Sequence, residues 1–135
     1  PMDVHGPMTL QLTPDLFVAA DKALAAARAE SALKERPPFD GDESILWIGD
    51  RASPMALAVF YDAGEGRIWL DLLYVQPEHR QTGMGTALLS CLRAIGQEEG
   101  YRAVLLGTSN EPMGNLARKQ GGTEHHTVYE LLAAA

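Results

Sequence analysis

Two glycines stand two residues apart at the point where an apolar, strand-like segment passes into a helix-like segment. They lie in the stretch Arg80-Gln81-Thr82-Gly83-Met84-Gly85, between strand-forming residues 68–75 and the helical apolar spacing that starts at Thr86. Because glycine has no side chain, Gly83 and Gly85 let the backbone come close to a ligand. The first N–H groups of a helix have no partner inside the helix, and this positive end favours an anion. The stretch therefore predicts a site for phosphate groups.

Two other phosphate-binding motifs match this stretch less well. A P-loop has Lys followed by Ser or Thr after its last glycine, whereas Thr86-Ala87 follows Gly85. The dinucleotide motif Gly-x-Gly-x-x-Gly needs a third glycine, and Leu88 stands at that position. A pair of glycines can also be a plain turn. The strand before the pair, together with Pro77, Arg80 and the helix that follows, favours the binding site over the turn.

The run Val75-Gln76-Pro77-Glu78-His79-Arg80-Gln81-Thr82-Gly83-Met84-Gly85 resembles the acyl-CoA loop of the GNAT acetyltransferase superfamily. That family's pattern is Arg/Gln-x-x-Gly-x-Gly/Ala after a strand that ends in Val-x-Pro, and the run matches it throughout. The resemblance implies acetyl-CoA (CoA) as the cofactor, and it implies as cofactor-binding residues Leu73, Tyr74, Val75, Arg80, Gln81, Thr82, Gly83, Met84, Gly85, Thr86 and Asn110. Arg80 could equally bridge two loops at the surface, and Asn110 could be a turn residue.

The pattern of apolar residues predicts a single domain, residues 1–135, with elements in the order β-α-β-β-β-α-β-α-β. Strands are expected over 8–12, 44–48, 55–61, 68–75, 103–106 and 127–131, and helices over 14–35, 86–99 and 113–120. This order is that of the GNAT acyl-CoA N-acyltransferase fold, an α/β (α+β) fold with a mixed central sheet of six or so strands flanked by helices. The fold implies that strands 68–75 and 103–108 lie side by side and splay apart to admit the pantetheine arm. One terminal strand is expected where two are common, so a homodimer could complete the sheet.

Acetyl transfer to an amine needs a neutral amine, a polarised thioester carbonyl and a proton for the leaving thiolate. A backbone N–H of the splayed strand could polarise the carbonyl. In much of the family a Tyr seven residues after the conserved Asn protonates the thiolate, but Ala117 stands at that position. Ser109 or Tyr129 could replace it, although a turn serine and a packed strand tyrosine are the plainer interpretations.

Asp71 is the leading candidate for the base that removes the amine's proton. Strand alternation places it on one face with Trp69, Leu73 and Val75. A carboxylate among apolar side chains is costly to bury unless it is paired or has a function. If that face is open to solvent, Asp71 is only a surface residue.

Composition limits the partners of this domain. The 18 acidic and 11 basic residues give a net charge of −7, which opposes binding to nucleic acid, suits a cationic amine and also serves solubility. No apolar run is long enough to cross a membrane, and no secretion signal is visible.

The single cysteine, Cys91, excludes an intramolecular disulfide and fits the cytoplasm. It lies in an apolar helix pattern typical of a buried thiol. Adjacent His125 and His126 would point to opposite faces of a strand, so no metal site is expected.

These features predict a cytoplasmic N-acetyltransferase that transfers the acetyl group of acetyl-CoA to an amine of a small molecule or of a peptide or protein. The amine would attack directly in a ternary complex. The alternative is a non-catalytic acyl-CoA-binding sensor or regulatory module of the same fold, which Ala117 favours. A third interpretation is an interaction protein that has kept the fold and lost the cofactor. The first two predict CoA binding, and only the first predicts turnover.

Overall fold

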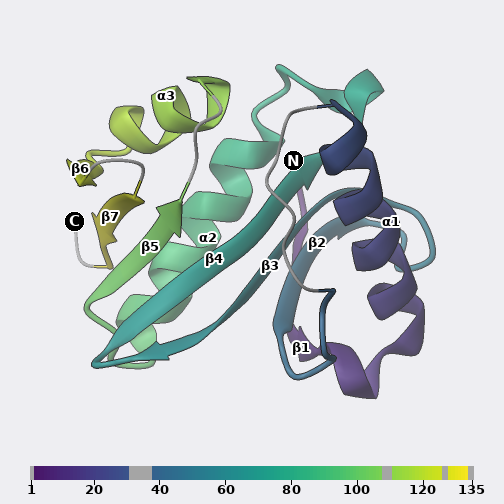
Figure 1. Ribbon diagram of the computed structural model, residues 1–135, viewed down its shortest axis with the longest axis horizontal. Helices are drawn as coiled ribbons and strands as arrows, with labels where there is room; N and C mark the ends of the chain where they lie inside the picture. The colour runs from purple at the N-terminus through teal and green to yellow at the C-terminus, as the bar shows by residue number, and fades with distance from the viewer. Residues whose placement is uncertain (1, 31–37, 108–110, 126–127, 134–135) are drawn as a thin grey trace.

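The computed structural model describes residues 2–30, 38–107, 111–125 and 128–133. These residues form one mixed sheet with the strand order β1-β2-β3-β4-β5-β7-β6, and helices cover both of its faces (Figure 1). The strands are β1 (Val4–Thr9), β2 (Ser44–Gly49), β3 (Pro54–Gly64), β4 (Arg67–Val75), β5 (Ala103–Gly107), β6 (Thr123–His125) and β7 (Val128–Leu132). The helices are α1 (Pro14–Glu30), α2 (Met84–Glu98) and α3 (Glu111–Lys119), with 3-10 turns η1 (Leu10–Leu12) and η2 (Pro77–His79).

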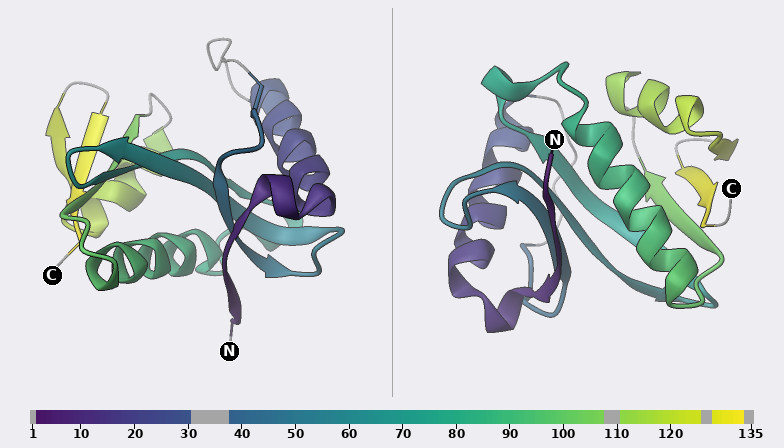
Figure 2. Two further views of the ribbon diagram at one scale, coloured as in Figure 1. Left: turned by 90° about the horizontal axis from the view of Figure 1, so that it is seen from below. Right: turned by 180° about the vertical axis from the view of Figure 1, so that it is seen from behind.

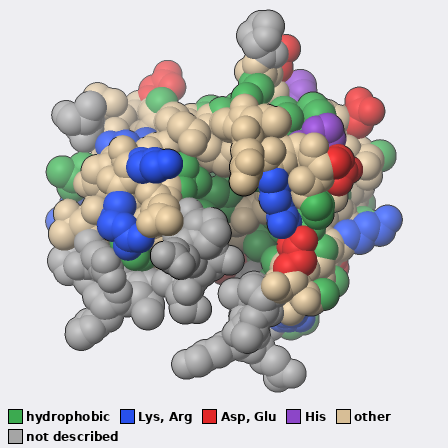
Figure 3. Space-filling model, turned by 90° about the horizontal axis from the view of Figure 1, so that it is seen from above, with side chains coloured by type: hydrophobic (Ala, Val, Ile, Leu, Met, Phe, Trp, Pro, Cys, Tyr) green, Lys and Arg blue, Asp and Glu red, His purple; other side chains and the backbone are tan. Residues whose placement is uncertain are grey.

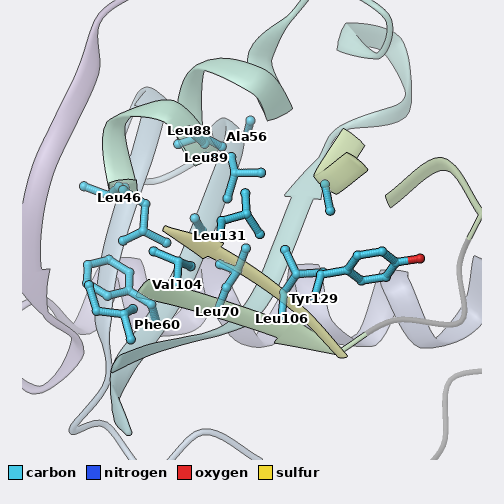
Figure 4. Packing of buried hydrophobic residues seen from close by; sticks show 14 of the residues in the cluster. Leu46, Ala56, Phe60, Leu70, Leu88, Leu89, Val104, Leu106, Tyr129 and Leu131 are labelled. Atoms are coloured by element: carbon cyan, nitrogen blue, oxygen red, sulfur yellow. The ribbon is translucent and has the colours of Figure 1, made fainter. Parts of the chain in front are cut away.

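Two clusters of buried side chains, one on each face of the sheet, hold these layers together. Figure 2 shows α1 on one side of the sheet and α2 on the other. The α1-side cluster joins α1 to β2, β3 and β4, and its members include Leu16, Leu24, Ile45, Leu57 and Leu72. The α2-side cluster, shown in Figure 4, joins α2 and α3 to the other face, and its members include Leu70, Leu88, Leu89, Val104 and Leu131. The apolar spacing of each helix thus buries one face, as the sequence indicates.

β4 and β5 pair over only part of their lengths. They run parallel, and their register extends from Arg67 opposite Ala103 to Leu70 opposite Leu106. β4 then continues to Val75, still paired with β3 on its other side. The two strands therefore lie side by side from Arg67 to Leu70 of β4. Beyond Leu70, β5 leaves the edge of β4 unpaired. This open wedge lies in the middle of the sheet rather than at its border.

A β-bulge in β4 lies where the wedge begins. Phe60 of β3 is opposite Leu70, and Val59 is opposite Leu72, so Asp71 is the extra residue of β4. Leu70 packs in the α2-side cluster and Leu72 in the α1-side cluster. Strict alternation would place these two leucines on one face. After the bulge, each side chain of β4 therefore points to the face of the sheet opposite to the one that strict alternation predicts.

The bulge corrects the predicted surroundings of Asp71. Leu73 and Val75 pack with Leu70 against the α2-side cluster, whereas alternation directs Trp69 to the opposite face from Leu70. Trp69 therefore lies on the opposite face from Leu73 and Val75, so the prediction that these three residues share one face with Asp71 is wrong for Trp69. The physical reason is an extra residue in the ladder, which a pattern of period two does not reveal.

Two strands at the ends of the chain also differ from the prediction. The first strand ends at Thr9, and the chain then turns through η1, where Leu10 becomes buried. A second terminal strand, β6, pairs with β7 from Thr123 opposite Glu130 to His125 opposite Val128. β6 was missed because its three residues show no apolar alternation. One chain thus supplies both terminal strands, so the sheet needs no second chain to complete it.

Candidate functional site

A cleft of about 630 Å³ opens at the wedge between β4 and β5. Figure 3 looks down on this end of the molecule, where the surface is hollowed, with hydrophobic side chains inside and charged side chains around the rim. The lining comes from the ends of α1, β4 and β5, the loop before α2, and α3. It consists of Ala27, Glu30, Leu70, Asp71, Leu72, Leu73, Tyr74, Val75, His79, Arg80, Gln81, Gly83, Met84, Gly85, Thr86, Leu106, Gly107, Met113 and Leu116.

The edge of β4 offers backbone hydrogen-bonding groups to this cleft. The N–H of Gln76 donates to the carbonyl of Met55 in the β3 segment at 2.9 Å. Along an antiparallel ladder, residues that bond to the partner strand alternate with residues that face away. Tyr74 therefore directs its N–H and C=O to β3, and Leu73 and Val75 direct theirs to the cleft side. Of the three strand residues predicted to bind the cofactor through their backbones, only Leu73 and Val75 face the right way.

The loop before α2 has a backbone conformation that favours anion binding. Gln81 and Gly83 have φ angles of 62° and 88°, in the left-handed region. Gly83 is the N-cap of α2 and provides no side-chain hydrogen bond to the first turn of the helix. The first N–H groups of α2 are therefore left for an external acceptor. The hydroxyl of Thr82 donates to the carbonyl of His79 at 2.5 Å and so braces the loop instead of facing a ligand.

Gly85 lies on the floor of the cleft, in the first turn of α2. A Cβ atom at Gly85 would lie 3.4 Å from a methyl group of Leu116, 3.8 Å from Leu73 and 4.0 Å from Val75. A Cβ atom there would make ordinary van der Waals contacts with α3 and the end of β4, and its absence keeps the floor of the cleft open. The short spacing between Gly83 and Gly85 is the local sequence signal of this site.

Arg80 connects three parts of the site. Its Nη2 donates to both carboxylate oxygens of Glu30 at 2.8 and 2.9 Å, and its Nε donates to the carbonyl of Val75 at 2.9 Å. The guanidinium also lies 5.4 Å from the ring centroid of Tyr74. The hydrogen bond with Glu30 raises the pKa of Arg80, and burial, followed by the charge of Glu30, raises the pKa of Tyr74. Arg80 thus joins the loop before α2 to helix α1 rather than to a second loop, and its contact with the cofactor stays a prediction.

Two carboxylates line the cleft on the side of α1 and β4. Asp71 is half-buried at the bulge, at the point where β4 and β5 part. Glu30 comes from the last described turn of α1. Sequence reasoning missed Glu30, because its partner Arg80 is 50 residues further along the chain and no local motif marks it.

The other predicted catalytic residues are not in the described lining of the cleft. Ser109 and the cofactor-binding candidate Asn110 lie outside the described residues. Tyr129 is 5% exposed, and its hydroxyl accepts a hydrogen bond from Nη1 of Arg118 at 2.7 Å. A Cβ atom on Gly114 of α3 would lie 2.9 Å from the same hydroxyl. Figure 4 shows the Tyr129 ring reaching out of the packed cluster with its hydroxyl at the outer end. The hydroxyl thus joins β7 to α3, and its catalytic role stays a prediction.

The described residues give no support to a metal site or to a reactive thiol. In this part of the chain, no group of three or more His, Cys, Asp or Glu side chains could hold a metal ion. None of its helices combines the length and apolarity needed to cross a membrane. Cys91 is half-buried in α2, and burial raises the pKa of its thiol, so the nucleophilic thiolate form is disfavoured.

Comparison with known proteins agrees with this geometry. The chain matches solved structures of acetyltransferases over almost its whole length. The ribosomal-protein-S18-alanine N-acetyltransferase of Escherichia coli is 16% identical, with a TM-score of 0.69 over 100% of this chain and 96% of that one. A GNAT-family acetyltransferase of Staphylococcus aureus Mu50 is 10% identical, with a TM-score of 0.74 over 98% and 99%. The PaiA N-acetyltransferase of Thermoplasma acidophilum, in complex with coenzyme A, is 13% identical, with a TM-score of 0.68 over 96% of each chain.

Sequence comparison assigns the family. No curated protein sequence matches this chain. The family model described as "Acetyltransferase (GNAT) family" matches residues 13–121, which include every element from α1 to the end of α3. The solved structures share the fold, and the family model covers most of the chain. This chain therefore belongs to the GNAT acetyltransferase family.

Proposed function

We propose that this protein is an acetyl-CoA-dependent N-acetyltransferase whose acceptor is an amine of a small molecule, a peptide or a protein. The observation that carries the proposal is that the edge of β4 left unpaired by β5 and the start of α2, which has no side-chain cap, line the same cleft. An extended chain with amide groups can pair with Leu73 and Val75 as an added strand, while its phosphates meet the N–H groups of the loop. Few ligands other than CoA carry an amide-containing arm joined to phosphates.

The residues present fit such a cofactor. The N–H groups of residues 81–86 would hold the phosphates, and the absent Cβ of Gly85 leaves the floor of the cleft open. Leu73 and Val75 would hold the arm through their backbones. When bound, acetyl-CoA supplies an activated acyl group for transfer to the amine. The position of Asp71, where β4 and β5 part, would place its carboxylate near the end of an arm laid along this edge.

Asp71 would act as the base in this reaction. An ammonium acceptor must lose a proton before its nitrogen can attack the thioester, and a carboxylate within reach can accept that proton. Direct attack in a ternary complex needs no nucleophile from the protein. Cys91 supports this route, because it is absent from the described lining of the cleft and burial raises the pKa of its thiol.

One observation favours a second candidate function, an acyl-CoA sensor without turnover. Ala117 is 0% exposed and packs in the α2-side cluster, in the place where much of the family has a tyrosine that protonates the thiolate. The described lining therefore lacks a hydroxyl from this position of α3. A sensor would bind acetyl-CoA and CoA and release no thiol with any amine.

Calorimetric titration with acetyl-CoA and CoA, followed by a thiol-release assay across a panel of amines, tests both candidates. The panel would contain polyamines, aminoglycosides, free amino acids and peptides with free N-termini. Binding with thiol release on one class supports the enzyme and identifies its acceptor. Binding without release on any member supports the sensor, and absence of binding contradicts both.

A further inference from the structure

The ion pair between Arg80 and Glu30 lies inside the cleft that the proposed function assigns to the cofactor. Both residues are lining residues, one from the loop before α2 and one from α1. Both carboxylate oxygens of Glu30 accept from the single nitrogen Nη2 of Arg80, at 2.8 and 2.9 Å. α1 is thereby tied to the loop that would hold the phosphates.

The same guanidinium also occupies a backbone group that the proposed function assigns to the cofactor arm. Nε of Arg80 donates to the carbonyl of Val75 at 2.9 Å, and that carbonyl faces the cleft. The guanidinium of Arg80 therefore makes its hydrogen bonds to Glu30 and Val75, and its contact with the Tyr74 ring, with groups that line the cleft. An arm that pairs with Val75 and a phosphate that attracts Arg80 would both draw the guanidinium away from this position.

We propose that Glu30 competes with the phosphates of the cofactor for Arg80, so that cofactor binding exchanges one partner of Arg80 for the other. Glu30 is then a residue that sets cofactor affinity, although it need not touch the cofactor. This inference rests on the proposed function, because it takes the phosphates of CoA as the competing ligand.

The exposure of the pair makes such an exchange feasible. The side chains of Arg80 and Glu30 are 43% and 37% exposed, so water screens their attraction and the pair adds little net stability. A phosphate group carries more negative charge than a carboxylate and can accept from two guanidinium nitrogens at once, whereas Glu30 is bound by Nη2 alone. The uncapped start of α2 adds N–H groups on the phosphate side, which Glu30 cannot use.

The test measures CoA affinity by calorimetry in Glu30→Gln, Arg80→Gln, the double variant and Glu78→Gln. Glu78 is exposed in η2, outside the described lining of the cleft, so its variant removes the same charge nearby without removing the ion pair. We expect Glu30→Gln to bind CoA roughly two- to fivefold more tightly, the range that corresponds to loss of an exposed ion pair. Glu78→Gln should change affinity less, and Glu30→Gln should bring no gain when Arg80 is already Gln.

The opposite role, a clamp that holds the cofactor loop in place, predicts the reverse result. Unchanged or weaker CoA binding by Glu30→Gln would overturn the exchange, as would an equal gain in the Arg80→Gln background. Thermal unfolding of each variant verifies that the fold is intact. If the wild-type protein binds no CoA, the proposed function fails; if it binds CoA and Glu30→Gln brings no gain, only the exchange fails.

Discussion

Replacing Gly83 by aspartate tests whether the loop before α2 binds phosphate or is only a turn. Gly83 has φ +88°, and the nearest atom to an added Cβ is the methyl carbon of Met2 at 3.6 Å. The side chain therefore fits in the free protein, and the cost to folding is backbone strain of about 1–2 kcal/mol. For 135 residues, unfolding entropies of about 2.1 cal/mol/K per residue convert each kcal/mol into a fall in Tm of about 3–4 °C.

The expected effect on binding is larger than the effect on folding. A carboxylate placed about 5 Å from a phosphate charge, at an effective dielectric constant of about 40, costs about 1.7 kcal/mol. That energy corresponds to a loss of CoA affinity of roughly fifteen- to twentyfold for each phosphate charge it meets. Steric exclusion of the phosphate from the N–H groups would weaken binding further.

Gly64→Asp is the matched control for this measurement. Gly64 has φ +81° with no heavy atom within 4 Å of an added Cβ, and it lies in the β3–β4 hairpin, at the opposite end of β4 from the cleft. Both variants should lose similar stability in thermal unfolding, whereas only Gly83→Asp should lose CoA affinity in calorimetry. Equal CoA affinities for the two variants would refute the assignment of the loop to phosphate binding.

Three further changes test the chemistry. Asp71→Asn should lower kcat/KM for the amine about 100-fold or more and leave CoA affinity unchanged, and an unchanged rate would remove Asp71 as the base. Tyr129→Phe removes the hydrogen bond with Arg118 and should cost about 1 kcal/mol of unfolding free energy by denaturant titration. Its kcat should stay within about twofold if the hydroxyl only joins β7 to α3, and a larger fall would support the catalytic role. Cys91, whose pKa is raised by burial, should react with iodoacetamide at pH 8 more slowly in the native protein than in urea, and equal rates would contradict its burial.

The loop before α2 could be predicted from sequence because its signal is local. Gly83 and Gly85, the strand before them and the helix after them are neighbours along the chain, so their spacing carries the geometry. The order of the elements was predictable for the same reason, since each core-facing pattern belongs to one segment. β6 was missed because its polar residues form a strand only through pairing with β7.

The details of the cleft depend on contacts between distant segments. The surroundings of Asp71 changed because β3 and β4 pair with one extra residue in β4, and no residue type marks a bulge in advance. Glu30 entered the site through its ion pair with Arg80, which joins α1 to a loop beyond β4. The N–H and C=O groups of Tyr74 point to β3 and not to the cleft because of the register between β3 and β4. Each of these features requires the tertiary structure.

The open edge of β4 is the strongest argument that the cleft was shaped for a ligand. Backbone N–H and C=O groups inside a sheet are almost always paired, because an unpaired group away from water costs free energy. β4 leaves Leu73 and Val75 unpaired by β5 although strands lie on both sides, and β3 holds β4 in place from behind. At this edge the carbonyl of Val75 accepts from Nε of Arg80 instead of from a strand. A ligand chain that pairs with this edge needs no movement of the strand, so little ordering cost opposes binding. The bulge at Asp71 lies where this edge begins, so one irregular residue of β4 brings a carboxylate to the place where the edge opens.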